Sequence, residues 1–204
     1  MIKRIWFFII ALGFLGSLCA QDSTYYRAKI WDSKISGFRK ADAKNIHPTH
    51  PILFIGSSSF ARWIGLRYCF SKYYILNCGF KGSITSDLIY YADDIIFPYK
   101  PSQIFIYEGD KDLANSMSID ELMIDIKTLV RIIEIRLPGF PVAILSIKSN
   151  PKRDRFRLKY ETSNALLKEF TQTKSNLTFI DVASVLIDEH GKYQWICLHP
   201  IRCI

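Results

Sequence analysis

Five short, mostly apolar runs, separated by segments with helical spacing, constrain the fold of this 204-residue chain more than any other feature. The runs lie at residues 52–55, 73–76, 103–107, 142–147 and 177–182. Such runs, bounded by Pro, Gly or polar residues, are typical of strands buried on both faces, as in a parallel sheet. Regular alternation of these strands with helices predicts a single α/β domain in which helices cover both faces of a parallel five-stranded sheet.

The intervening segments carry helix signals. Ser118 and Glu121 form a capping box that opens a helix ending near Arg136, before Pro138. A short helical connection is also expected at residues 59–70, and helices are expected from 85 or 86 to Pro98 and at 157–171. No helical pattern follows residue 183, so the sequence predicts a missing C-terminal helix and one sheet face short of cover near that end.

The first twenty residues resemble a secretory signal. Lys3 and Arg4 precede an apolar segment at residues 5–18, which is short for a bilayer span, and small residues follow it. We therefore expect a signal peptide at residues 1–20, a partly helical lead-in segment at 21–50 and the α/β domain at 51–204. A secreted or periplasmic protein follows from this interpretation, with no stable membrane insertion after cleavage.

The formal net charge of +8 is partly local, because six basic residues crowd residues 148–159. A charge run of this kind is more often a solvated loop and helix start than a binding surface. No nucleic-acid-binding motif accompanies it, so we expect no nucleic acid as a partner.

Four cysteines follow the first twenty residues: Cys69, Cys78, Cys197 and Cys203. They contain no CxxC pair and no spacing typical of a metal site, so no metal is expected. Cys78 follows an apolar run, which predicts a small buried residue. An exported protein forms disulfides readily, but the pairing does not follow from the sequence.

Chemically useful residues follow several of the predicted strands. Three serines (57–59) follow the first strand, a glycine-containing turn (77–83) the second and an acidic turn (108–112) the third, while His190 and His199 lie beyond the fifth. A hydroxyl, preorganised donors and an imidazole at one sheet edge suit acyl transfer. The chain has no G-x-S-x-G motif, which disfavours a nucleophile of the α/β-hydrolase type.

These blocks resemble those of the SGNH (GDSL-type) hydrolases, over roughly residues 51–200. Gly56-Ser57-Ser58 lies where that family has Gly-Asp-Ser, which implies that Ser58 is the nucleophile. Residues 77–82 are similar to the second family block and imply that the Gly82 amide contributes to the oxyanion hole. The resemblance also implies a three-layer α/β/α sandwich with a flavodoxin-like strand arrangement, and serine chemistry without cofactor or metal.

The two later blocks depart from the family pattern. Lys111 lies where the family carries the asparagine of Gly-x-Asn-Asp, another oxyanion donor. Leu198-His199-Pro200 resembles the final block and implies His199 as general base, but Ile196 lies where the family has an aspartate. Asp181 and Asp188 are alternative acids, although each is more easily explained as a cap of a strand end or turn.

Three functions remain open from the sequence. The first is an ester hydrolase, acting on small-molecule or carbohydrate esters, whose activity is weakened or lost through Lys111 and Ile196. The second is an inactive relative that binds a glycan or acyl ligand, with Lys111 contacting an anionic group. The third is a flavodoxin-like cofactor binder, in which the serine-rich turn holds a phosphate.

Overall fold

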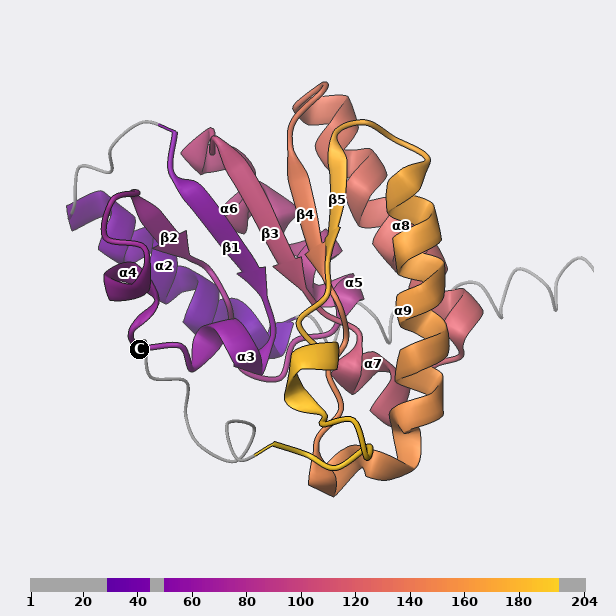
Figure 1. The fold of residues 1–204 in the computed structure, drawn as a ribbon. Coiled ribbons are helices and arrows are strands. Elements are labelled where there is room, and N and C mark those ends of the chain that lie inside the picture. The colour runs from indigo at the N-terminus through magenta and orange to yellow at the C-terminus, as the bar shows by residue number, and fades with distance from the viewer. Residues whose placement is uncertain (1–28, 45–49, 195–204) are drawn as a thin grey trace, which may run out of the picture.

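The computed structural model describes residues 29–44 and 50–194. Its centre is a five-stranded sheet in the order β2-β1-β3-β4-β5, and every pairing is parallel (Figure 1). The strands are β1 (Ile52–Gly56), β2 (Ile75–Asn77), β3 (Gln103–Tyr107), β4 (Val142–Leu145) and β5 (Leu177–Ile180). The predicted parallel α/β sandwich is confirmed.

Helices connect the strands. The α-helices are α2 (Asp32–Lys44), α3 (Ser58–Ala61), α4 (Leu66–Cys69), α5 (Thr85–Tyr90), α6 (Ala92–Ile95), α7 (Asp110–Ala114), α8 (Ile119–Arg136) and α9 (Arg157–Gln172). Short 3-10 turns are η1 (Lys29–Trp31), η2 (Phe97–Tyr99), η3 (Pro151–Phe156) and η4 (Ser184–Leu186). The capping box that opens α8 is present, because the Ser118 hydroxyl accepts from the Glu121 backbone and the Glu121 carboxylate accepts from the Ser118 backbone.

Alternation along the strands divides the core into two layers. One layer, which we call the large face, receives residues such as Leu53, Ile55, Ile104 and Ile106, which are completely buried. The apolar sides of α2, α5, α6, α8 and α9 pack on this face. The residues between them point the opposite way, as the two-residue period of a strand requires.

The opposite layer, the small face, is built around Phe54, Tyr107 and Leu145. Phe60 of α3 and Leu66 of α4 are the buried helical residues that pack on it. In Figure 1, α3 and α4 lie on one side of the sheet, while α8 and α9 lie on the other. Both sheet faces therefore carry helices, but the two layers differ greatly in size.

Two helix predictions are wrong in extent. The helical connection expected at residues 59–70 consists of two short helices, because tight turns at Trp63 and Ile64 interrupt it and Gly65 is the N-cap of α4. The helix expected from residue 85 to Pro98 is divided at Tyr91 into α5 and α6. The second strand also starts later than predicted, at Ile75.

Several expectations lie outside the described residues. These are the signal peptide at 1–20, most of the lead-in segment before Lys29, and residues 195–204 of the stretch where a C-terminal helix is expected to be missing. In the described part of that stretch, up to residue 194, the helical structure is the short 3-10 turn η4. The described part of the lead-in is helical, as η1 and α2. No helix in the part of the chain that the structure describes is long and apolar enough to cross a bilayer.

Candidate active site at the carboxyl end of the sheet

The chain turns sharply out of β1 at Gly56. This residue has a φ of +139°, and a Cβ there would lie 2.1 Å from the Tyr107 carbonyl oxygen. Only glycine fits so close to the neighbouring strand. The turn buries Ser57, whose amide donates to the Tyr107 carbonyl at 3.1 Å, and makes Ser58 the first residue of α3.

Ser58 is half-buried, so this residue is partly accessible to solvent. Among the described residues, the Ser58 hydroxyl makes no hydrogen bond. The neighbouring Ser59 is half-buried as well. Ser58 combines partial access with an uncommitted hydroxyl, which is what a nucleophile requires. Its place as the first residue of α3 distinguishes it from Ser59.

The turn after β2 lies directly against this serine turn. The Phe80 amide donates to the Gly56 carbonyl at 2.9 Å. The Asn77 side chain donates to the Phe60 carbonyl at 2.8 Å and accepts from the Gly79 amide at 2.9 Å. Asn77 thus connects the second turn to α3, a role that its spacing in the sequence did not reveal.

Gly82 and Lys111 are brought together, although 29 residues separate them. The Lys111 ammonium donates to the Gly82 carbonyl, and a Cβ on Gly82, whose φ is +88°, would lie 3.2 Å from that nitrogen. The ammonium also lies 5.9 Å from the centre of the Trp31 ring. A cation therefore lies beside the glycine whose amide is the expected oxyanion donor.

A pair of buried carboxyl groups lies beneath these turns. The Ser83 hydroxyl donates to Glu108, and the Thr85 amide donates to Asp112 at 2.8 Å. Glu108 and Asp112 are 2% and 1% exposed. Burial, and then repulsion from Asp112, raises the pKa of Glu108 well above its usual range; burial likewise raises the pKa of Asp112.

These bonds connect the turn after β2 to the turn after β3. Burial favours the neutral form of both carboxyl groups. The Ser83–Glu108 contact was not predictable, since a serine and a glutamate 25 residues apart in the sequence give no signal of pairing. No cluster of His, Cys, Asp or Glu within residues 29–44 and 50–194 is arranged to hold a metal ion.

In the basic stretch at 148–159, Lys152, Arg155 and Lys159 are exposed, while Arg153 and Arg157 are half-buried and form ion pairs. Arg153 forms an ion pair with Asp110 at 2.6 Å, while burial raises the pKa of that carboxyl and Arg153 opposes the shift. Arg157 binds Asp154 at 2.6 Å. These pairs fix η3 and the start of α9 at the carboxyl end of the sheet.

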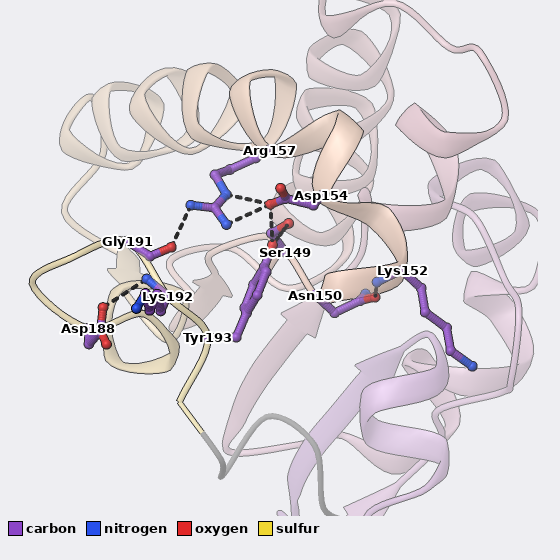
Figure 2. Close-up of polar contacts among 9 residues, drawn as sticks. All are labelled: Ser149, Asn150, Lys152, Asp154, Arg157, Asp188, Gly191, Lys192 and Tyr193. Carbon is purple, nitrogen blue, oxygen red and sulfur yellow. Dashed lines mark hydrogen bonds and ion pairs between the residues drawn. The ribbon is translucent and has the colours of Figure 1, made fainter.

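A polar network holds the chain segment that follows β5, as Figure 2 shows. The Tyr193 hydroxyl lies 2.7 Å from both the Asp154 carboxylate and the Ser149 hydroxyl. Arg157 donates to the Gly191 carbonyl at 2.9 Å, and its guanidinium lies 4.9 Å from the centre of the Tyr193 ring. We call Ser149, Asp154, Arg157 and Tyr193 the Tyr193 clamp.

The proposed base, His199, and its neighbour Ile196 lie outside the described residues, so the separation of Ser58 and His199 stays a prediction. Asp181 accepts from the Ala183 and Ser184 amides at 3.0 and 3.1 Å, and its pKa is lowered. Burial acts against that lowering, and the hydrogen bonds from Ser184, Ser146 and Ala183 outweigh it.

Asp188 accepts from the His190 and Lys192 amides at 3.0 and 2.8 Å. Both aspartates therefore act as caps, as expected. His190 is an exposed turn residue, with 73% of its side chain accessible.

The cysteines follow the prediction where the structure describes them. Cys78 is buried and free, and burial raises the pKa of its thiol to about 12, which makes it inert as a nucleophile. Cys69, at the end of α4, is disulfide-bonded.

No protein-family model matches the chain, and no curated protein sequence matches it. Solved structures do. A Streptococcus pneumonia protein described provisionally as a platelet activating factor is 20% identical, with a TM-score of 0.71 over 88% of this chain and 87% of that one. A GDSL-like lipase from Bacteroides thetaiotaomicron is 16% identical, with a TM-score of 0.67 over 82% and 89%.

An acetylxylan esterase from Geobacillus stearothermophilus is 18% identical, with a TM-score of 0.56 over 76% of this chain and 90% of that one. At these identities the likeness concerns the backbone. Together with the parallel sheet in the order β2-β1-β3-β4-β5, these likenesses show that the protein has the fold of the SGNH, or GDSL-type, hydrolases.

Proposed function

We propose that the chain is a secreted or periplasmic SGNH-type esterase that hydrolyses acyl or acetyl esters, among them esters of carbohydrates. The observation that carries the proposal is the meeting of the Ser58, Gly82 and Lys111 turns at one end of a parallel sheet. The lipase and acetylxylan esterase that share the fold support this reaction class.

The proposed reaction uses two half-steps. The Ser58 oxygen attacks the ester carbonyl while His199 takes the hydroxyl proton, and His199 then gives that proton to the departing alcohol. Water repeats the sequence on the acyl-enzyme and releases the acid. The Gly82 amide holds the negative oxygen, with Lys111 as a cationic neighbour.

The first experiment compares p-nitrophenyl acetate hydrolysis by the wild-type protein and the Ser58→Ala and His199→Ala variants. Both variants are expected to lose turnover above the buffer rate. Ser59→Ala is the matched control, because it removes the adjacent hydroxyl and should retain most of the activity. Equal rates for wild type and Ser58→Ala would remove Ser58 from the mechanism.

A second experiment restores the family residues. Lys111→Asn places a neutral amide donor in the site and is expected to raise turnover by about 10²-fold, the effect of one oxyanion donor. Adding Ile196→Asp supplies an acid behind the imidazole, and the loss of such an acid lowers turnover by about 10⁴ in serine proteases. A double variant no faster than wild type would contradict the assigned positions.

The position of Lys111 also favours a second candidate, an inactive SGNH-fold protein that binds a glycan or acyl ligand. An ammonium beside Gly82 is better suited to an anionic group than to a neutral carbonyl. Calorimetry with acidic and neutral acetylated oligosaccharides tests this. Binding without turnover, weakened in Lys111→Ala, would favour the candidate, and unchanged affinity would exclude it.

A further inference from the structure

The segment between the serine helix and β2, residues 62–73, exposes an unusual number of large apolar side chains. Ile64 is 93% exposed, Tyr68 82%, Tyr73 60% and Phe70 39%. We call residues 62–73 the aromatic segment. Single exposed apolar residues are ordinary, but several within one short segment mark an interaction surface.

Some residues of the aromatic segment pack against the small face of the sheet. They occupy the inward positions, so the remaining residues of the segment point outward. Leu66 is 1% exposed and packs on the small face. The Trp63 and Phe70 rings lie 6.1 Å apart, and Phe70 lies 6.2 Å from Phe54 of β1. The buried positions are already filled, which leaves Ile64 and the two tyrosines facing water.

The charged side chains of the aromatic segment itself have one sign. Arg62, Arg67 and Lys72 are exposed, and the sequence from 62 to 74 contains no acid. The exposed Ile124 and Ile135 of α8 differ, because Asp120, Glu121, Asp125 and Glu134 lie on the same helix. Exposed apolar area and unopposed positive charge thus coincide in the aromatic segment.

We propose that the aromatic segment docks the protein peripherally on an anionic lipid surface. Tyr and Trp rings suit the headgroup region, Arg and Lys interact with anionic lipids, and Ile64 enters the acyl boundary. An aliphatic side chain this exposed favours lipid over a sugar polymer, for which flat aromatic stacking would suffice. Because the segment starts four residues after Ser58, docking brings the serine turn close to the interface.

The test measures binding of the full chain to phosphatidylcholine vesicles with and without phosphatidylglycerol, by flotation at low salt. We expect tighter binding to the anionic vesicles, weakened by added salt. Arg67→Gln should lower the anionic-vesicle affinity about fivefold, which corresponds to about 1 kcal/mol per basic residue, and leave neutral vesicles unaffected. Ile64→Ser should lower binding to both, by about tenfold on anionic vesicles.

Ile135→Ser is the matched control, since it removes an isoleucine of similar exposure, 68%, from α8. All variants carry the same N-terminus, so residues 1–20 contribute equally to each. Unchanged binding in Ile64→Ser, equal losses in Ile64→Ser and Ile135→Ser, or binding to an acidic polysaccharide but to no vesicle would each overturn the proposal. Vesicle binding is measured without turnover, so an inactive Ser58 would leave it standing.

Discussion

The two faces of the sheet differ in how completely the helices that cover them bury large apolar side chains. On the large face, α2, α5, α6, α8 and α9 bury aliphatic residues completely, while on the small face α3 and α4 are four residues each and leave large side chains in water. Long helices bury more apolar area, and apolar burial is the dominant favourable term in folding. Stability therefore resides mainly on the large face.

The small face carries the features to which we assign a function. Ser58 begins α3, and the aromatic segment includes α4. Short helices with few buried side chains leave other polar and apolar groups accessible, and a catalytic or binding site requires accessible groups. This division between a stabilising face and a functional face can be tested by mutation.

The largest effect is expected from two adjacent residues of β3 that point to opposite faces. Ile106→Ala should lower the free energy of unfolding by about 2–5 kcal/mol, because it opens a cavity in a fully buried layer. Phe105→Ala should lower it by about 1–2 kcal/mol, since this ring is partly exposed and stacks on Phe54 at 4.7 Å. Urea denaturation measures both; equal losses would contradict the division.

The next effect concerns the pH dependence of stability at the site. Glu108 has a raised pKa in the folded protein, so its contribution is fully present below its unfolded pKa and is lost as pH rises through the folded value. As pH rises from the unfolded toward the folded pKa of Glu108, the wild type should therefore lose stability more steeply than Glu108→Gln. The groups facing Glu108 are Asp112, Ser83, Asp110 and Asp87.

Urea denaturation of both proteins across this pH range checks the difference. Some slope should persist in Glu108→Gln, because burial also raises the pKa of Asp112. Parallel pH profiles for wild type and variant would show that Glu108 does not titrate in this way.

The smallest effect is expected at the Tyr193 clamp. Tyr193→Phe removes the hydroxyl that contacts Asp154 and Ser149, and should cost about 1 kcal/mol because the site is partly solvated. Hydrogen exchange should quicken at the Gln194 amide, which donates to the Leu186 carbonyl. Tyr68→Phe is the control, since Tyr68 is 82% exposed. If the Gln194 amide exchanged equally fast in Tyr68→Phe, the result would contradict the role of the Tyr193 clamp.

Much of the fold was predictable from local patterns. Each buried strand left a mostly apolar run, and Ser118 with Glu121 marked the start of α8 correctly. The failures were at residues 59–70 and 85–97, where apolar residues at helical spacing concealed tight turns. Helical periodicity reports which side is buried but not whether the backbone continues without a break.

The candidate site was predictable only in part. The position of Ser58 followed from the glycine and serines after an apolar run, yet the contacts of Asn77 with α3 and of Ser83 with Glu108 left no trace in the sequence. Such contacts join residues far apart along the chain. Their partners depend on which strand ends meet, and strand order is a tertiary property.

By itself, the sequence determined the parallel α/β architecture and the turn that carries Ser58, because strand burial and glycine geometry are local constraints. Only the tertiary structure decided that the Lys111 ammonium contacts Gly82, that Glu108 is buried beside Asp112, and that Ile64 and Tyr68 face water. The physical reason is that contact, desolvation and exposure depend on which segments pack together, and the order β2-β1-β3-β4-β5 is what brings these segments to their places.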